Sequence, residues 1–378
     1  MDHLDLSAKT REIAARVTAP AAATHDRDGT YPQETMKALA QAGVLGLNVP
    51  IDLGGLGLGP RAVSEILTIL AEADGSVAMI TMMHLLGTAC IAAAPKPDRD
   101  VLRKIASGEH LTTLAFSEKG SRSHFWSPIS KAVRRDGRVG ITADKSWVTS
   151  AGFAQSYVVA TLSADGKGPT DSTLYLVPSD AHGAKVKSAW DGMGLRANAS
   201  APMMFEVEVT DAARITEEGA GFKAMLEVVL PLFNVGSAAV ALGLSRAATG
   251  ATISHLKSAQ FEHLGVSLGE ALPNLRAQLA DMQIACDSLA SLIEDTVRHM
   301  ESGDPNTMLR VLQVKALGGE TAIRVTSLAM RTCGGAAFSK HTAIERFFRD
   351  AHAGAVMAPT VDVLREFIGK ALLGLPLF

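Results

Sequence analysis

A tryptophan and a threonine stand two residues apart at the end of a predicted strand, in the segment KSWVTSAG that contains Trp147, Val148 and Thr149. An indole ring and a hydroxyl in this arrangement supply an aromatic wall and a hydrogen-bonding group, which a large flat ring with a polar rim requires. Taken alone, the pair also fits a core tryptophan followed by a strand-end threonine. The pattern therefore indicates a candidate ring-binding edge.

A second polar group lies in and just after the segment LAFSEKGSRS, where Arg122 and His124 both donate hydrogen bonds. A guanidinium can hold a phosphate through two parallel hydrogen bonds. We expect these two side chains to contact substrate or phosphate, and the alternative is a solvated loop.

The composition argues against several classes of function. The 36 basic and 39 acidic residues nearly balance, so the sequence indicates no basic surface for nucleic acid. Cys90, Cys286 and Cys333 are widely spaced and predict neither a disulfide framework nor a zinc site, and we expect no metal. The N-terminus shows no leader pattern, and the apolar run 228–244 is interrupted by polar residues. We expect a cytoplasmic protein without a membrane span.

Three segments of different character follow one another along the chain. Helical periodicity dominates residues 1–110, short alternating apolar runs separated by turns fill 111–212, and helical periodicity returns over 213–378. Long helices are predicted near 222–258, 270–301, 306–333 and 357–373, which suggests a four-helix bundle. The fold class is therefore α+β and multidomain, with an N-terminal all-α domain, a middle β-barrel or sandwich domain and a C-terminal bundle.

Several motifs, taken in order, resemble the acyl-CoA dehydrogenase superfamily over nearly the whole chain. They are AGVLGLNVPIDLGGLGLGP, LAFSEKGSRS, KSWVTSAG, VALGLSRAA, LADM and CGG followed by IERFFRDA. The resemblance implies a flavoprotein, with FAD as the expected cofactor. It also implies a homotetramer or homodimer in which one subunit completes the cofactor site of another. The long apolar helices agree with such an assembly.

The resemblance also implies roles for individual residues. The flavin ring is expected to contact Phe116, Ser117, Ser123, Trp147, Val148, Thr149 and Thr360. In the flavin loop, however, Lys119, Ser121, Arg122 and His124 replace the family's proline, alanine, glycine and aspartate. Replacing a glycine costs backbone freedom, which suggests that the loop is reshaped.

The far end of the cofactor is also expected to be held differently. A family arginine that pairs with the diphosphate is missing from SAQFEHLGVSLGE, where Gln260, Glu262 and His263 remain. Arg331, just before Gly334 and Gly335, is expected to restore that charge on the partner subunit's FAD; the alternative is a surface arginine. Weaker binding of the diphosphate end of FAD would leave FMN or free reduced flavin as alternative cofactors.

The usual general base is absent at both positions that the family uses. Ala358, followed by Pro359 and Thr360, replaces the glutamate of Glu-Gly-Thr, and Phe233 occupies the alternative position on the helix. Asn234 beside it is a candidate substrate contact. The nearby substitutes for the base are His352, Asp362 and Glu227, each of which also fits a surface or salt-bridge role. The catalytic residue is therefore unknown.

Three functions remain open from the sequence. The first is oxidation of an acyl-CoA-like thioester at its α,β carbons with a non-standard base and an electron-transfer partner. The second is a monooxygenase of the same fold that receives reduced flavin from a flavin reductase and acts on a small molecule. The third is a catalytically silent flavin-binding scaffold. The first two functions act on a small-molecule substrate. Thioester oxidation needs a general base whereas the monooxygenase reaction does not, so the absent glutamate bears on the choice between them.

Overall fold

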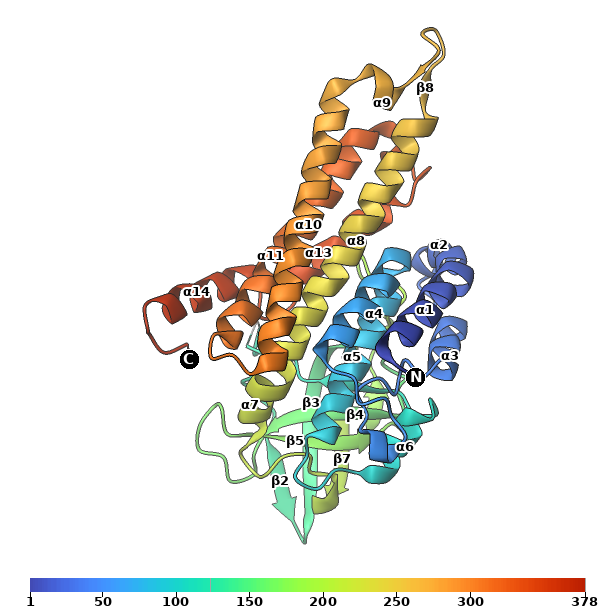
Figure 1. Ribbon diagram of the computed structural model, residues 1–378. Helices are drawn as coiled ribbons and strands as arrows, with labels where there is room; N and C mark the ends of the chain where they lie inside the picture. Colours follow the sequence, from blue (N-terminus) through green and yellow to red (C-terminus); the bar gives the residue numbers. More distant parts are fainter. Residues whose placement is uncertain (123, 378) are drawn as a thin grey trace.

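The computed structural model describes residues 1–122 and 124–377, and it confirms the predicted order of a helical part, a β part and long helices (Figure 1). The first helices are α1 (His3–Ile13), a π-helical turn η1 (Ala14–Thr18), α2 (Ala19–Asp28) and α3 (Gln33–Gln41). After the 3-10 turn η2 (Ile51–Leu53) come α4 (Pro60–Ala73), α5 (Gly75–Ala92) and α6 (Arg99–Ala106). Asp74 begins α5 by accepting a hydrogen bond from the Ser76 amide at 2.8 Å.

The middle part contains two small sheets. The strands are β1 (Thr112–Ala115), β2 (Ala132–Arg135), β3 (Arg138–Val148), β4 (Ser156–Leu162), β5 (Ser172–Pro178), β6 (Ala184–Val186) and β7 (Ala201–Thr210). One sheet has the order β1-β4-β5, with β1 and β4 parallel, and the other has the antiparallel order β2-β3-β7-β6. Tyr157 of β4 meets Phe205 of β7 edge to face at 5.5 Å, which ties one sheet to the other through the core.

Long helices form the C-terminal part. After η3 (Asp211–Ala213) the helical elements are α7 (Gly221–Ala224), η4 (Met225–Val229), α8 (Leu230–Ser258), α9 (Leu268–Ala271), α10 (Pro273–Ser302), α11 (Thr307–Cys333), α12 (Gly335–Phe338), α13 (Ile344–Val356) and α14 (Val361–Leu372). A short hairpin of β8 (Gln260–Phe261) and β9 (Val266–Ser267) follows α8 at the end of the bundle remote from the β-domain (Figure 1).

The predicted helix over 357–373 was placed a few residues too early, and α13 was missed as a separate helix. Residues 357–360 form a connection between α13 and α14. Thr360 has extended backbone angles, and its hydroxyl accepts a hydrogen bond from the Val363 amide at 3.4 Å, so α14 begins at Val361. This cap fixes the loop that carries Ala358.

Two helical segments are apolar and long enough to cross a bilayer by length and composition, namely α5 and the continuous stretch Gly221–Ser258. In each, 83% of the most apolar window is buried against other parts of the chain. They therefore pack as core helices here.

A buried ion pair joins the loop after β1 to strand β3. The Lys145 ammonium lies 2.6 Å from Glu118 Oε1 and also donates to the carbonyls of Phe116 and Ala160. Glu118 accepts further hydrogen bonds from the amides of Ile129 and Ser130. Burial alone would raise the pKa of Glu118, but the Lys145 ammonium and these donors lower it below its usual value. The pair therefore holds both ends of the loop 116–130.

Removing one partner of this pair should destabilise the protein strongly. We expect Lys145→Met to lower the free energy of unfolding by about 3–5 kcal/mol, because it leaves the Glu118 carboxylate buried without a counter-ion. Chemical denaturation measures the change. The matched control is Lys187→Met, which breaks an exposed pair with Asp144 and should cost less than about 1 kcal/mol. A double variant Glu118→Gln with Lys145→Met should recover part of the loss, and equal losses in the two single lysine variants would contradict this account.

Candidate functional site

The candidate ring-binding edge lies where the loop after β1 meets the end of β3. The Ser146 amide donates to the Ser117 carbonyl at 2.9 Å, and Glu118 pairs with Lys145 in an antiparallel bridge. These contacts place the segment Phe116–Ser117 next to Trp147, although 29 or more residues separate them in sequence. The structure thus brings together two groups of residues that the sequence named independently.

Trp147 presents its indole to the outside. Its side chain is 62% exposed, and its edge-to-face partner Trp190 lies 5.7 Å away between ring centroids. The backbone at Trp147 is left-handed, with φ +60°, and the ladder between β3 and β7 shifts register between Lys145 and Val148. A bulky residue rarely adopts this conformation, and such strain is typical of functional positions. The bulge turns the indole out of the sheet.

The two residues after Trp147 point inward. Val148 is fully buried in the core and pairs with Ala201 of β7. Thr149 is buried too, and its hydroxyl shares a 3.0 Å hydrogen bond with the Ser200 hydroxyl. The neighbouring Ser150 hydroxyl lies 2.9 Å from the Tyr31 hydroxyl of the N-terminal part. The strand end is therefore fixed by hydrogen bonds on both sides.

The segment 190–200 connects this strand end to helix α13. Besides the contacts of Trp190 and Ser200, the Leu195 amide donates to Asp350 Oδ1 at 2.6 Å. Arg349, the residue before Asp350, donates to the Met193 carbonyl and forms a salt bridge with Asp26 at 2.5 Å. Helix α13 ends a few residues later at the loop 357–360. The candidate site consequently lies at the junction of the β-domain and the bundle.

Burial changes the acidity of Asp350. Loss of solvent raises the pKa of this carboxyl to about 7, and the hydrogen bond from Leu195 opposes the shift only in part. Asp350 is therefore partly protonated near neutral pH.

A buried lysine holds the loop that carries Ala358. Lys315 of α11 is 1% exposed, and its ammonium donates to the Met357 carbonyl at 2.9 Å and to the Pro359 carbonyl at 2.5 Å. These carbonyls flank Ala358 on either side. The ammonium also lies 5.5 Å from the centre of the Phe233 ring. One side chain therefore contacts both positions at which the usual base is replaced.

Among the residues that the structure describes, Lys315 forms no salt bridge. Burial consequently lowers its pKa to about 7. A neutral amine still has two N–H donors for the two carbonyls, so the loop is held in either protonation state.

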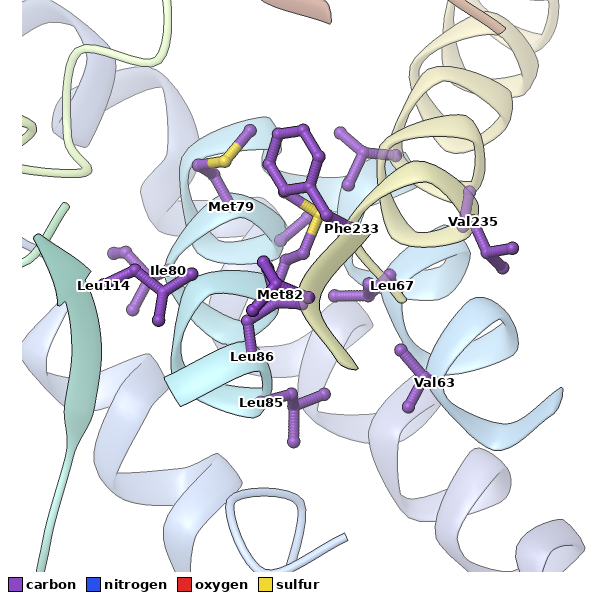
Figure 2. Packing of buried hydrophobic residues seen from close by; sticks show 14 of the residues in the cluster. Val63, Leu67, Met79, Ile80, Met82, Leu85, Leu86, Leu114, Phe233 and Val235 are labelled. Carbon is purple, nitrogen blue, oxygen red and sulfur yellow. The ribbon is translucent and has the colours of Figure 1, made fainter. Parts of the chain in front are cut away.

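Phe233 makes the alternative base position apolar. Figure 2 shows its ring among Met79, Met82 and Leu67, from helices α4 and α5. The proposed substitute bases lie elsewhere. His352 Nδ1 is 2.7 Å from the Phe348 carbonyl within α13, Asp362 is exposed on the first turn of α14, and Glu227 is exposed 3.9 Å from Lys223. Among the described residues, none of these three forms a hydrogen bond or ion pair with Ala358.

The reshaped loop contains Arg122 and His124, both exposed. Arg122 has φ +53°, so the arginine adopts the left-handed backbone that the family's glycine would favour. His124 stacks on Trp126 at 5.0 Å, and Phe116 lies 6.4 Å from Phe125 in the same aromatic group. Ser123 lies outside the described residues. The two predicted substrate contacts are thus accessible, and their role stays a prediction.

Asn234 lies in a different place from the one that we expected for a substrate contact. It is fully buried, and its amide nitrogen donates to the Val311 carbonyl of α11 at 3.2 Å. The side chain therefore packs between α8 and α11, because the helical repeat turns it away from the face that carries Phe233.

Arg331, Gly334 and Gly335 lie at the opposite end of the bundle from Trp147. Cys333 Sγ is 3.8 Å from the Thr252 hydroxyl near the end of α8, which fixes this location. All three residues are exposed, and a Cβ at either glycine would meet no described atom within 4 Å. Glu262 and His263 are exposed in the hairpin there. Within one chain these residues cannot serve the flavin edge at Trp147.

Two residues of the site escaped sequence reasoning. Lys315 interrupts the apolar face of a predicted bundle helix, and an uncompensated lysine on such a face was the available signal. Ser237 of α8 is buried, and its hydroxyl has no hydrogen-bond partner among residues 1–122 and 124–377. Serines within apolar helices are too common to single it out.

Comparison with known proteins assigns each part of the chain to a known type of domain. Family models match the N-terminal, middle and C-terminal domains of acyl-CoA dehydrogenases over residues 1–109, 113–207 and 219–373. A probable acyl-CoA dehydrogenase of Mycobacterium leprae is 26% identical, with coverage of 98% of this chain and 95% of that protein. The cyclohex-1-ene-1-carbonyl-CoA dehydrogenase of Geobacter metallireducens is 27% identical, with coverage of 96% of each. The butyryl-CoA dehydrogenase structure from Megasphaera elsdenii superposes with a TM-score of 0.92 at 23% identity, covering 99% of this chain and 100% of that one.

The lowered pKa of Lys315 gives the folding free energy a specific pH dependence. The unfolded chain keeps this proton up to about pH 10.5, whereas the folded chain loses it near pH 7, so unfolding takes up a proton between these values. The stability of the parent relative to Lys315→Met should therefore rise with pH across this window, by up to about 1.4 kcal/mol per pH unit. Urea denaturation between pH 6 and pH 9 measures it. The control is Lys257→Met at an exposed site of α8, and a pH-independent difference for Lys315→Met would refute the assignment.

Proposed function

Because the chain belongs to the acyl-CoA dehydrogenase family, we propose that it is a flavin-dependent oxidoreductase that oxidises an acyl-CoA-like thioester at the α,β carbons, with a base other than the usual glutamate. The observation that carries the proposal is the junction of Trp147, Thr149 and the loop 357–360, in a chain that matches all three family domains. FAD is the proposed cofactor, and it supplies the hydride acceptor when bound.

The residues at the junction suit the ring end of a flavin. Trp147 offers an open aromatic face, and the Thr149 hydroxyl, fixed by Ser200, lies two residues further along the same strand end. The buried pair of Glu118 and Lys145 keeps Phe116 and Ser117 beside them. A preorganised edge of this kind binds a flat ring without a large rearrangement, which favours affinity.

The diphosphate end requires residues that one chain does not bring to Trp147. Arg331 and the open backbone at Gly334 and Gly335 lie at the remote end of the bundle, so we propose that they contact the cofactor of a second subunit. The protein would then be a homodimer or a homotetramer. A single arginine with no paired carboxylate offers a weaker site than a dedicated cluster, which keeps FMN in consideration.

The residues of this chain can orient a thioester but offer no carboxylate at Ala358 or Phe233. Lys315 fixes the carbonyls on either side of Ala358, and Phe233 packs with Met79 and Met82 in an apolar cluster (Figure 2). Removal of an α-proton then depends on a base outside these two positions. Loss of a positioned general base commonly reduces the rate by about 10²- to 10⁴-fold, so slow turnover is expected.

The same observation favours a second candidate function, that of a monooxygenase that uses reduced flavin and O₂ on a small molecule and needs no α-proton base. The named relatives are dehydrogenases, which keeps thioester oxidation first. The first candidate requires an electron-transfer protein as its partner, and the second requires a flavin reductase. A cytoplasmic location suits either.

Replacing Trp147 should weaken flavin binding. We expect Trp147→Ala to bind FAD roughly three- to tenfold more weakly than the parent, because an aromatic face contributes about 0.5–1.5 kcal/mol. The matched variant Trp147→Phe keeps an aromatic wall and should bind nearly as the parent does. Fluorescence titration of the apoprotein measures both. If Trp147→Ala binds FAD and FMN as tightly as the parent, this strand does not form the flavin site.

Restoring a carboxylate at position 358 should accelerate thioester oxidation. We expect Ala358→Glu to increase the rate at which an acyl-CoA bleaches the oxidised flavin band anaerobically, by roughly 10²-fold or more, while Ala358→Gln should not. Stopped-flow absorbance with a panel of acyl-CoAs measures the rates.

The failure of that experiment distinguishes the alternatives. Bleaching by no acyl-CoA in any variant, together with a transient absorption band when reduced flavin meets O₂, would replace the proposal by the monooxygenase. Flavin that binds but responds to neither treatment would favour a silent scaffold.

A further inference from the structure

We infer that a small cavity between α5, α8 and α13 receives a hydroxyl group carried by the acyl chain of the substrate, so that the substrate is a hydroxylated acyl thioester. The inference rests on the proposed thioester oxidation. It is carried by the position of the cavity next to the loop 357–360 and by two polar groups that line it, the Ser237 hydroxyl and the Asp350 carboxyl.

The cavity lies where small residues of two helices line a common space. Ser237 and Ala241 of α8 and Ala351, Ala353 and Gly354 of α13 line it, together with Asp350 and with Met357 just after α13. Met79 of α5 closes the third side. The residues that could fill the centre are alanine and glycine, and the free space is about that of one water molecule.

One end of the cavity adjoins the reacting loop. Met357 precedes Ala358 directly, and Asp350 lies seven residues earlier, which corresponds to about 10.5 Å along the helix. Methionine is the most adaptable apolar side chain, so it can yield to an entering chain at modest cost. An acyl chain whose thioester lies at Ala358 can therefore extend along the face of α13 toward Asp350.

The Ser237 hydroxyl is the first sign that a polar group belongs in this space. Its residue is 5% exposed, and its oxygen has no hydrogen-bond partner. Other buried hydroxyls of the same helix behave differently. Ser245, Thr249 and Thr252 donate to the carbonyls four residues earlier, at 2.7, 2.8 and 2.8 Å. Since this local bond is the usual partner within a helix, a serine that does not make it keeps its hydroxyl for another group.

The Asp350 carboxyl supplies the second polar group. Oδ1 accepts from the Leu195 amide, whereas no described residue donates to Oδ2. Gly75 at the start of α5 leaves room around this oxygen, because a Cβ there would lie 2.9 Å from it. A hydroxyl that enters the cavity can donate a hydrogen bond to this carboxyl oxygen.

A hydroxyl suits the pair better than an amine or a carbonyl does. It donates one hydrogen bond and accepts others, so it can donate to Asp350 and accept from Ser237, or the reverse. An ammonium is less suitable, because the remaining lining is apolar and would leave its other donors unpaired. A methyl group of equal size would form no hydrogen bond with Ser237 or with Asp350 Oδ2, which produces discrimination against unsubstituted chains.

The test compares binding, so it does not depend on turnover. Isothermal titration calorimetry on the flavin-loaded protein would use short and medium straight-chain acyl-CoAs, each with and without a terminal hydroxyl. We expect one chain length at which the hydroxylated thioester binds roughly tenfold more tightly than its unsubstituted counterpart. In Ser237→Ala the ratio should fall toward one. Ser237→Val fills the space and should weaken the hydroxylated thioester selectively.

Two controls separate this role from a general effect on folding. Ser237→Ala removes a hydroxyl that has no partner, so it should leave the melting temperature unchanged or higher. Ser245→Ala removes a hydroxyl from the same helix that is bonded to the Ala241 carbonyl, and it should leave the preference intact. Equal loss of preference in both variants would overturn the inference.

The remaining outcomes also decide between the proposals. If thioesters bind but the hydroxyl makes no difference at any length, the inference fails and thioester oxidation stands. If no acyl-CoA binds, both fail together.

Discussion

One hydrogen bond, from the Leu195 amide to the Asp350 carboxylate at 2.6 Å, links the β-domain to the helical bundle at the candidate site. Trp190, which contacts Trp147, and Ser200, which contacts Thr149, lie on the same segment as Leu195. The position of the ring-binding edge relative to α13, and thus to Ala358, therefore depends on this anchor. The adjacent salt bridge between Arg349 and Asp26 fixes the same segment to the N-terminal helices, so three parts of the chain converge here.

The buried ionisable groups of the junction fall into two kinds. Glu118 and Lys145 are paired and surrounded by further donors and acceptors, so their charges persist and secure the loop before the flavin edge. Lys315 and Asp350 have no opposite charge in direct contact among the described residues, and burial moves the pKa of each to about 7. The paired charges therefore stabilise the loop 116–130, whereas Lys315 contacts the loop 357–360 and Asp350 lines the cavity beside it.

The sequence predicted the order of domains because its hydrophobic periodicity changes abruptly near residues 110 and 212, and local patterns report secondary structure directly. It also singled out Trp147 and Thr149 as a candidate ring-binding edge, because their spacing in a strand is visible without tertiary information, and their role in flavin binding stays a prediction. It could not orient Asn234, because the face that a helical residue presents depends on which neighbour packs against it. Lys315 was missed for the same reason, since its partners are backbone carbonyls 42 and 44 residues away that carry no signature in the sequence. The start of α14 was predicted too early because apolar residues lie on both sides of Thr360. Their pattern hides the threonine cap at which the helix begins.

The surroundings of Ala358 restrict the kind of base that can act there. Phe233, Met79 and Met82 form an apolar cluster (Figure 2), and Ala358 packs against the hydrophobic core to which they belong. A carboxylate placed among these side chains would be disfavoured by desolvation. Lys315 lies behind the loop and would oppose that effect, because its ammonium is held against the flanking carbonyls. The lysine that would support a glutamate at position 358 is thus present, although alanine occupies that position. A base that is neutral in its resting state would be less disfavoured by desolvation in such surroundings than a carboxylate. Under the proposed thioester oxidation, the residues around Ala358 therefore favour an uncharged proton acceptor over a second carboxylate.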